Sequence, residues 1–387
     1  MSHMRRSAMC AFLAVIVSGT ASAQELPRGE IIEDVQCQQD TSQHYALYLP
    51  SYFNLLRQWP VILAFDGGGR GRQGVERYRA AAEKYGYVVA GSNNSRNGPW
   101  NVGLDAAAAI TADIKRRFPI DLKRMYTAGM SGGARVAIML AQNSPEIAGV
   151  FASSAGYSTT FHKSERFPIF GSAGTEDFNY REMRAVDRLM TSPHRVEIFE
   201  GGHTWLPIEM ATRGVEWMEI QAMKSGLRPR DETLIAELYS KRVARANTQP
   251  RSLARMRELK RIATDFEGLR DVAKVIESAA ALEGRQDVAA QLSVEQAEDA
   301  RELRVKSEAD SLVRQLGWPE RADAALVSLK SFVASLLDIA RQEADSSERR
   351  IARRVLAGLR ASRGGIANQK FQEWIAGIQL PAPPQSH

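Results

Sequence analysis

The stretch from residue 124 to residue 140 is RMYTAGMSGGARVAIML, and it decides the fold. Residues 124–128 are a short run of strand-forming residues, and residues 134–140 have the composition of a helix. Between them lies Gly129-Met130-Ser131-Gly132-Gly133, a G-x-S-x-G motif in the strand–turn–helix context that a nucleophile elbow requires. Small residues are needed because larger side chains would strike the neighbouring strand or helix. The pattern predicts a strained turn that exposes the Ser131 hydroxyl at the amino end of a helix.

The same alternation of strand and helix extends along the first half of the chain. We expect further strands at residues 31–37, 44–49, 61–65, 87–91, 149–153, 168–171 and 195–199. We expect helices at residues 73–84, 104–117, 134–142, 180–190 and 208–224. Several of the strands are continuous apolar runs, which is typical of strands buried on both faces. The fold class is therefore α/β, with a mostly parallel sheet flanked by helices and functional groups at the carboxyl ends of the strands.

A change of character near residue 226 divides the chain. Residues 24–226 form the predicted catalytic domain, and Gly226 and Pro229 indicate a helix stop and a linker. Residues 227–380 are predicted to form an all-helical domain, because apolar residues recur there at helical spacing. Three stripes carry this pattern: Leu253, Met256, Leu259, Ile262, Phe266 and Leu269; Leu326, Leu329, Val333, Leu336, Leu337 and Ala340; and Phe371, Trp374, Ile375 and Ile378. Residues 381–387 are predicted to be a disordered tail.

The first residues have the pattern of an export signal. Arg5 and Arg6 precede a short apolar core at residues 8–17, and Ala21-Ser22-Ala23 supplies the small residues of a cleavage site. This predicts a cleavable signal peptide at residues 1–23 and a secreted or periplasmic product. The apolar run is too short to span a bilayer. Cys37 would be alone in the mature chain, which excludes a disulfide scaffold and a cysteine zinc cluster.

Composition and charge exclude several classes of function. The chain has 387 residues, with 51 Lys and Arg against 45 Asp and Glu, for a net charge of +6. Neither domain has the dense basic stripe of a nucleic-acid-binding protein, so no nucleic-acid partner is expected. No segment after the signal approaches transmembrane length. No cofactor and no metal ion are expected.

A serine nucleophile needs a base and a group that orients it. His203 lies in Gly201-Gly202-His203-Thr204-Trp205, directly after the last predicted strand, where an imidazole could accept the serine proton. The preceding strand leads into Gly174-Thr175-Glu176-Asp177. We predict Asp177 as the triad acid, with Glu176 as the alternative. For Glu176 we prefer a structural role, as an acidic residue near the start of the next helix. The order Ser131, Asp177, His203 is that of α/β-hydrolases.

An oxyanion hole for this serine would use two backbone N–H groups. Gly132 follows the nucleophile and supplies one of them. The second is expected from the loop after the strand at residues 61–65, which is Asp66-Gly67-Gly68-Gly69. We predict Gly68 as this donor, since glycine lets the backbone approach a substrate closely.

Taken together, these motifs resemble a known family. Residues 24–225 are similar to secreted α/β-hydrolases of the dienelactone hydrolase, polyhydroxybutyrate depolymerase and feruloyl esterase branch. The resemblance rests on residues 45–50, 66–69, 117–121, 129–135, 174–177 and 202–205. It departs at Asp66-Gly67, where many relatives have His-Gly. It implies a serine esterase, and it does not extend to the helical domain.

Weaker signals concern the substrate. Trp100, Tyr157 and Trp205 are predicted to flank the nucleophile and to contact substrate, with packing as the equal alternative for Trp100. The connection at residues 157–166 is too short for an inserted cap. We therefore expect an open cleft, unless the C-terminal helices cover it. An open cleft and export suit a bulky or polymeric ester, and small esters would fit equally.

The function predicted from the sequence is hydrolysis of carboxylic esters through an acyl-enzyme. Two alternatives are a serine peptidase or amidase and a non-catalytic binding protein that uses the helical domain for a protein partner. A third is a dinucleotide-binding oxidoreductase, because residues 69–74 match G-x-G-x-x-G. The acidic ribose partner of that fold is absent, since Ser92-Asn93-Asn94 stands in its place.

Overall fold

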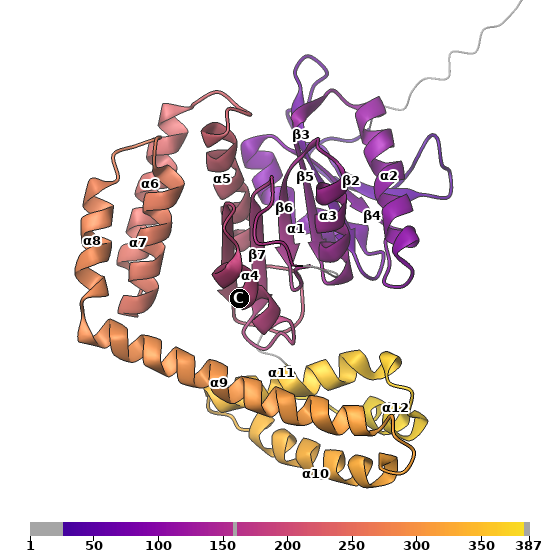
Figure 1. The fold of residues 1–387 in the computed structure, drawn as a ribbon. Helices are drawn as coiled ribbons and strands as arrows, with labels where there is room; N and C mark the ends of the chain where they lie inside the picture. The colour runs from indigo at the N-terminus through magenta and orange to yellow at the C-terminus, as the bar shows by residue number, and fades with distance from the viewer. Residues whose placement is uncertain (1–25, 158–160, 383–387) are drawn as a thin grey trace, which may run out of the picture.

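The computed structural model describes residues 26–157 and 161–382 (Figure 1). The predicted signal at residues 1–23 and residues 383–387 of the predicted tail lie outside these described residues. The described strands form one sheet: β1 (Ile31–Gln36), β2 (His44–Tyr48), β3 (Trp59–Asp66), β4 (Val88–Ser92), β5 (Ile120–Met130), β6 (Ile147–Ser153), β7 (Ile169–Gly174) and β8 (His194–Phe199).

The strand order in this sheet is β1-β2-β4-β3-β5-β6-β7-β8. β2 pairs antiparallel with β1 and with β4, whereas every pair from β4 to β8 is parallel. The connecting helices are α1 (Gly71–Tyr85), α2 (Trp100–Arg117), α3 (Gly132–Asn143), α4 (Tyr180–Leu189) and α5 (Ile208–Lys224). This is an α/β-hydrolase-like arrangement, so the predicted fold class is confirmed.

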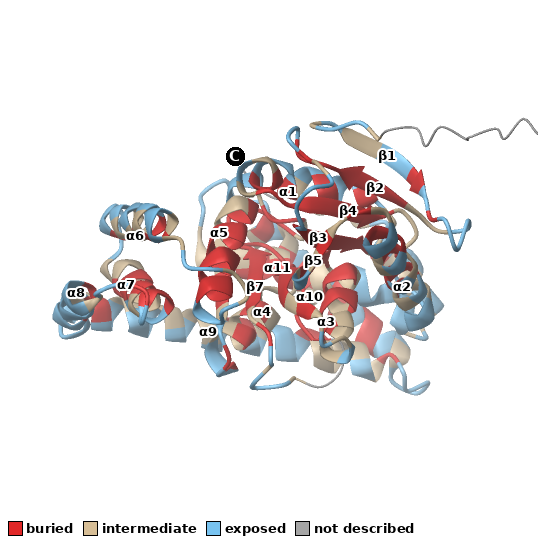
Figure 2. Cartoon of the chain, turned by 90° about the horizontal axis from the view of Figure 1, so that it is seen from above, coloured by how far each residue is buried: buried red, intermediate tan, exposed pale blue. Residues whose placement is uncertain are grey.

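The sheet is buried on both faces. Two separate apolar clusters cover it, one that includes α2 and α3 and one that includes α1 and α5. All eight residues of β3 are buried, which explains why residues 59–65 are a continuous apolar run without alternation. The inner strands are accordingly red in Figure 2.

The C-terminal region is all helical, as predicted, and it contains two large apolar cores and a small one formed by Leu253, Met256 and Val288. Its helices are α6 (Glu232–Asn247), α7 (Ser252–Phe266), α8 (Ala273–Glu283), α9 (Gln286–Gln315), α10 (Ala322–Ala340), α11 (Ser347–Ser362) and α12 (Gln369–Ala376). One large core joins α6, α7 and α8 to Ile220 and Met223 of α5, and the other lies among α9 to α12. The long helix α9 runs between the two groups (Figure 1). The predicted boundary at residue 226 therefore cuts a shared core between α5 and α6.

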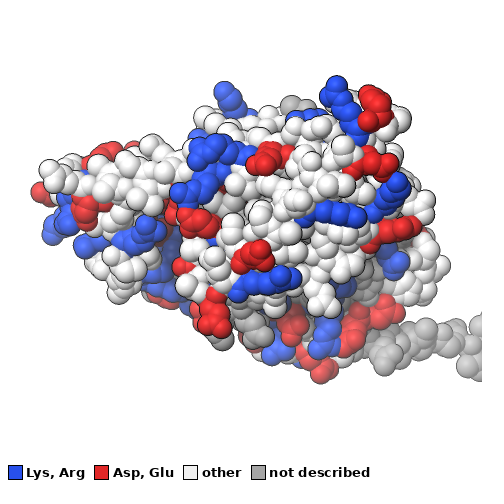
Figure 3. All heavy atoms as spheres, turned by 90° about the horizontal axis from the view of Figure 1, so that it is seen from below, with Lys and Arg blue, Asp and Glu red and all other residues white. Residues whose placement is uncertain are grey.

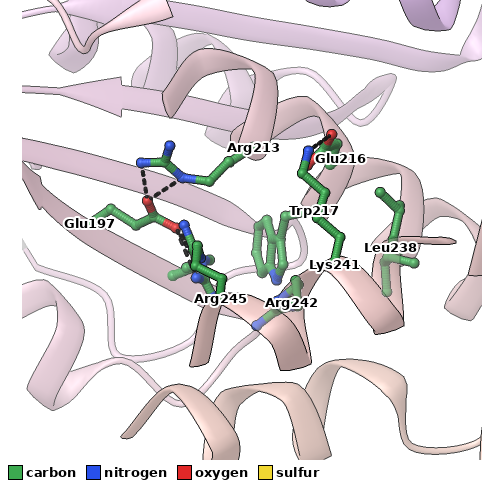
Figure 4. A pocket seen from close by; sticks show the side chains of 10 residues that line it. Glu197, Arg213, Glu216, Trp217, Leu238, Lys241, Arg242 and Arg245 are labelled. Carbon is green, nitrogen blue, oxygen red and sulfur yellow. Dashed lines mark hydrogen bonds and ion pairs between the residues drawn. The ribbon is translucent and has the colours of Figure 1, made fainter. Parts of the chain in front are cut away.

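Buried charges also tie the first helix group to the sheet. Arg195 of β8 donates to Glu197 at 2.8 Å and to Glu258 of α7 at 2.9 Å, and Arg245 of α6 donates to Glu197 at 3.3 Å. Figure 4 shows Glu197 between Arg213 and Arg245 at this interface. The hollow there has a volume of about 30 Å³, which is near the space of one water molecule. We therefore regard it as a structural junction and not as a ligand site.

Because the side chains of Glu197 and Glu258 are largely buried among arginines, we expect the protein to lose stability in acid. Burial opposes their charged forms, but the surrounding arginines outweigh it and lower the pKa of Glu197 and of Glu258. These carboxylates bind protons more readily in the unfolded chain than in the folded one. They therefore stabilise the fold fully at a pH above their unfolded pKa of about 4.3, and this stabilisation is lost as the pH falls below that value. We expect Tm to fall between about pH 5 and pH 3, less steeply in Glu197→Gln than in the wild type. The exposed variant Glu232→Gln is the control, and equal slopes in wild type and Glu197→Gln would contradict the assignment.

The described surface is mixed in charge. On the face seen in Figure 3, basic and acidic side chains are interspersed rather than grouped by sign. Among residues 26–157 and 161–382, none of the helices is long and apolar enough to cross a bilayer.

Candidate active site

The strand–turn–helix prediction at Ser131 matches the structure. β5 ends at Met130, α3 begins at Gly132, and Ser131 between them has φ 57° and ψ −122°. A non-glycine residue with this backbone is strained by about 1–3 kcal/mol. A Cβ on Gly129 would overlap the Gly133 carbonyl, and one on Gly133 would overlap the Phe65 carbonyl of β3. The two glycines are thus required for the close approach of strand and helix.

Ser131, His203 and Asp177 form a continuous chain of hydrogen-bonding atoms. The distance from Ser131 Oγ to His203 Nε2 is 2.8 Å, and that from His203 Nδ1 to Asp177 Oδ1 is also 2.8 Å. Asp177 is 0% exposed, and its Oδ1 accepts a second bond from the Asn179 N–H at 2.8 Å. With the proton on Nδ1, the imidazole can accept the serine proton at Nε2.

Three contacts hold the two loops of this chain in place. The Phe178 ring is stacked on the His203 ring with centroids 4.0 Å apart. Ser154, with φ 59°, donates from Oγ to the Thr204 carbonyl at 2.7 Å. A Cβ on Gly174 would overlap the backbone of the loop that carries His203, so the loops pack backbone to backbone. Phe178 and Ser154 were not found from the sequence, because these contacts depend on how the loops fold.

The structure corrects the prediction for Gly68. Its N–H donates to Oδ1 of Asp66 at 2.7 Å, two residues back, and is therefore not available to an oxyanion. Asp66 is buried and also accepts from Arg70 Nε and from Trp205 Nε1, both at 2.8 Å. Asp66 thus fixes the fold of this loop from within.

The N–H of Gly67 differs from that of Gly68, because no described residue accepts a hydrogen bond from it. Among the described residues, none accepts from the N–H of Gly132 either. Gly67 and Gly132 both lie against the side-chain amide of Asn97: a Cβ on Gly67 would be 2.6 Å from Oδ1, and one on Gly132 would overlap it. The Asn97 N–H also donates to the Gly67 carbonyl at 2.8 Å. Gly67 and Gly132 therefore lie close together against the Asn97 side chain, and Gly132 directly follows Ser131.

The role of Asp66 leads to a prediction for Asp66→Asn. An amide at this position presents an N–H₂ group to at least one of three donors, so Trp205 Nε1 or the Gly68 N–H loses its acceptor. A buried donor without a partner costs about 1–3 kcal/mol. We expect a lower Tm than that of the wild type. Exposed Asp105→Asn is the matched control, and a wild-type Tm for Asp66→Asn would contradict this role.

The three predicted aromatic contacts have different surroundings. Trp205 is 3% exposed and packs in the core near Gly74, so it positions Asp66, and the prediction that it contacts substrate is not supported. Tyr157 is also buried in the core, with its ring against Phe161. Trp100 is 43% exposed at the start of α2. Of the three, Trp100 alone has a side chain with ready access to solvent.

Glu176 pairs with the C-terminal helices and not with His203. Its carboxylate accepts from Arg353 of α11 at 2.9 and 3.1 Å, rather than acting at the start of α4. The adjacent Arg354 donates to the Thr175 carbonyl at 2.5 Å and pairs with Glu302 of α9 at 2.6 Å. Helix α11 thus holds the loop that carries Asp177.

The C-terminal region also forms a wall beside the imidazole. A pocket of about 270 Å³ includes His203 on one side and residues of α11 on the other. Leu380, Pro381 and Ala382 complete it, so the start of the predicted disordered tail is placed against the site. The open cleft expected from the short β6–β7 connection is therefore bordered by the helices on the His203 side.

Comparison with known proteins gives distant structural matches. No protein-family model matches the chain, and no curated protein matches it. The fluorophosphonate-binding serine hydrolase FphF of Staphylococcus aureus is 16% identical with a TM-score of 0.41, covering 50% of this chain and 99% of that one. A feruloyl esterase module from Clostridium thermocellum is 12% identical with a TM-score of 0.38, covering 48% and 85%. An S-formylglutathione hydrolase from Agrobacterium tumefaciens is 15% identical with a TM-score of 0.39, covering 49% and 93%.

Proposed function

We propose that this protein is a serine hydrolase that cleaves carboxylic esters through an acyl-enzyme. The observation that carries the proposal is the pair of 2.8 Å contacts that join Ser131, His203 and Asp177 at the ends of β5, β8 and β7. A strained backbone at a serine has few structural uses. A nucleophilic serine, in contrast, requires the exposed hydroxyl that such a strand–helix turn presents.

In the proposed reaction, Ser131 Oγ attacks the ester carbonyl carbon while His203 Nε2 takes the hydroxyl proton. The carbonyl oxygen becomes negative and is stabilised by the N–H groups of Gly67 and Gly132. The imidazolium is stabilised by Asp177, and it then gives its proton to the alcohol oxygen as the ester bond breaks. Water repeats the sequence on the acyl-serine, which releases the acid and restores the hydroxyl.

Turnover of a neutral chromogenic ester tests this proposal. We expect the mature full-length chain to hydrolyse p-nitrophenyl butyrate, and we expect a fluorophosphonate to abolish that activity in proportion to labelling. A chain that neither hydrolyses esters nor reacts with the fluorophosphonate would favour a non-catalytic binding protein. Because α5 and α6 share a core, the experiment uses the whole chain and not a version that ends near residue 226.

A further inference from the structure

We propose that the pocket between His203 and α11 binds the alcohol portion of the ester, and that Arg360 selects alcohols that carry a carboxylate. This inference rests on the proposed function, because it assigns the substrate class of the same site. It gives the C-terminal helices a direct part in substrate choice.

The position of the pocket favours the alcohol portion. The acyl carbonyl oxygen would face the Gly67 and Gly132 amides, whereas the alcohol oxygen must receive a proton from His203 Nε2. The alcohol therefore leaves along the imidazole. The pocket of about 270 Å³ includes His203 and not these two glycines, so it lies on the side of the site that the alcohol would occupy.

The charges in this pocket favour an anion. Two arginines line it, Arg353 and Arg360, against one acidic residue, Glu176. Arg353 is occupied, because it donates to the Glu176 carboxylate and to the Ala382 carbonyl. Arg360 has no hydrogen-bond or ion-pair partner among the residues that the structure describes, and it is exposed at the pocket. One guanidinium is therefore free to bind a carboxylate in the planar, two-bond geometry that suits both groups.

The rest of the wall is apolar. Ala357, Leu380 and Pro381 line the same pocket, and the buried Leu356 lies beneath it. Such a surface suits a hydrocarbon or aromatic skeleton between the ester oxygen and the charge. The chemistry that fits is an aryl or alkyl alcohol with a carboxylate at its far end. The guanidinium comes from α11, and the apolar wall comes from α11 and from the segment that follows α12, all of them outside the α/β sheet.

Matched esters test the inference. Three pairs of phenyl acetates carry, in the para position, a carboxylate or its neutral carboxamide, with zero, one or two methylene groups as spacer. The readout is the ratio of kcat/KM for the anionic ester to that for its amide, measured by release of the phenol. We expect Arg360→Gln to lower this ratio about tenfold for at least one pair, and Arg360→Lys to lower it less. Arg314→Gln, an exposed arginine outside the pocket, is the control that should keep the wild-type ratio.

The two proposals fail in distinguishable ways. Ratios that stay within about twofold of wild type for all three pairs in Arg360→Gln overturn the inference while p-nitrophenyl butyrate is still hydrolysed. A wild-type chain that turns over neither the pairs nor p-nitrophenyl butyrate overturns the proposed function, and the inference with it. A ratio that falls equally in Arg314→Gln and Arg360→Gln also overturns the inference, because net charge alone would then explain it.

Discussion

Ser131→Ala should lower kcat for p-nitrophenyl butyrate by at least about 10⁴-fold, because no other group can form the acyl-enzyme. The fold should remain, since the Ser131 side chain has no hydrogen bond other than the one to His203 among the described residues. The Ser131 N–H keeps its bond to the Ser153 carbonyl at 2.9 Å in the alanine variant.

The measurement for this variant combines kinetics with thermal unfolding. An unchanged Tm with lost turnover separates a missing nucleophile from a misfolded chain. Ser154→Ala is the matched control, because Ser154 is the other non-glycine residue with positive φ among the described residues and its hydroxyl contacts the Thr204 backbone. It should lower turnover far less. Wild-type turnover in Ser131→Ala would contradict the nucleophile assignment.

Asp177→Asn should lower kcat by about 10⁴-fold, while Glu176→Gln should lower it by about tenfold or less. The Asp177 carboxylate is buried and accepts from His203 Nδ1, so it keeps the proton on Nδ1 and leaves Nε2 free to act as base. An asparagine that turns its N–H₂ group toward Nδ1 would favour the other tautomer, in which Nε2 carries the proton. Glu176 pairs with Arg353 instead, and its loss affects the loop only indirectly.

These neighbouring variants control for each other, because both remove one buried negative charge from the same loop. The two kcat values and the two Tm values should be measured together. Compared with its small effect on kcat, Glu176→Gln should lower Tm clearly, since it leaves Arg353 without its ion-pair partner. The reverse ranking of kcat values would transfer the role of triad acid to Glu176.

The parts of the fold that could be predicted are those that the sequence encodes locally. The turn at Ser131 was found because its glycines adjoin a strand and a helix within a few residues of one another. Asp177 and His203 were placed together because the carboxyl ends of neighbouring parallel strands lie at one edge of a sheet. The bounds of α5 agree with the expected residues 208–224 for the same reason: the apolar spacing is local.

The parts that could not be predicted depend on contacts distant in sequence or on loop conformation. Glu176 and Arg353 are 177 residues apart, and no pattern in either segment indicates the other. The Gly68 N–H is occupied by Asp66 because the loop turns back on itself, which composition alone does not reveal. The position of Trp205 after the last strand predicts a cleft residue. In the structure it is buried, and its indole N–H donates to Asp66.

The central claim is that Ser131 is a nucleophile activated by His203, and site-mapped fluorophosphonate labelling tests it most directly. The account predicts a single adduct per chain, located by peptide mass spectrometry on Ser131, absent in Ser131→Ala and formed far more slowly in His203→Ala. An adduct on another residue, or no adduct on a folded chain that hydrolyses esters, would contradict it.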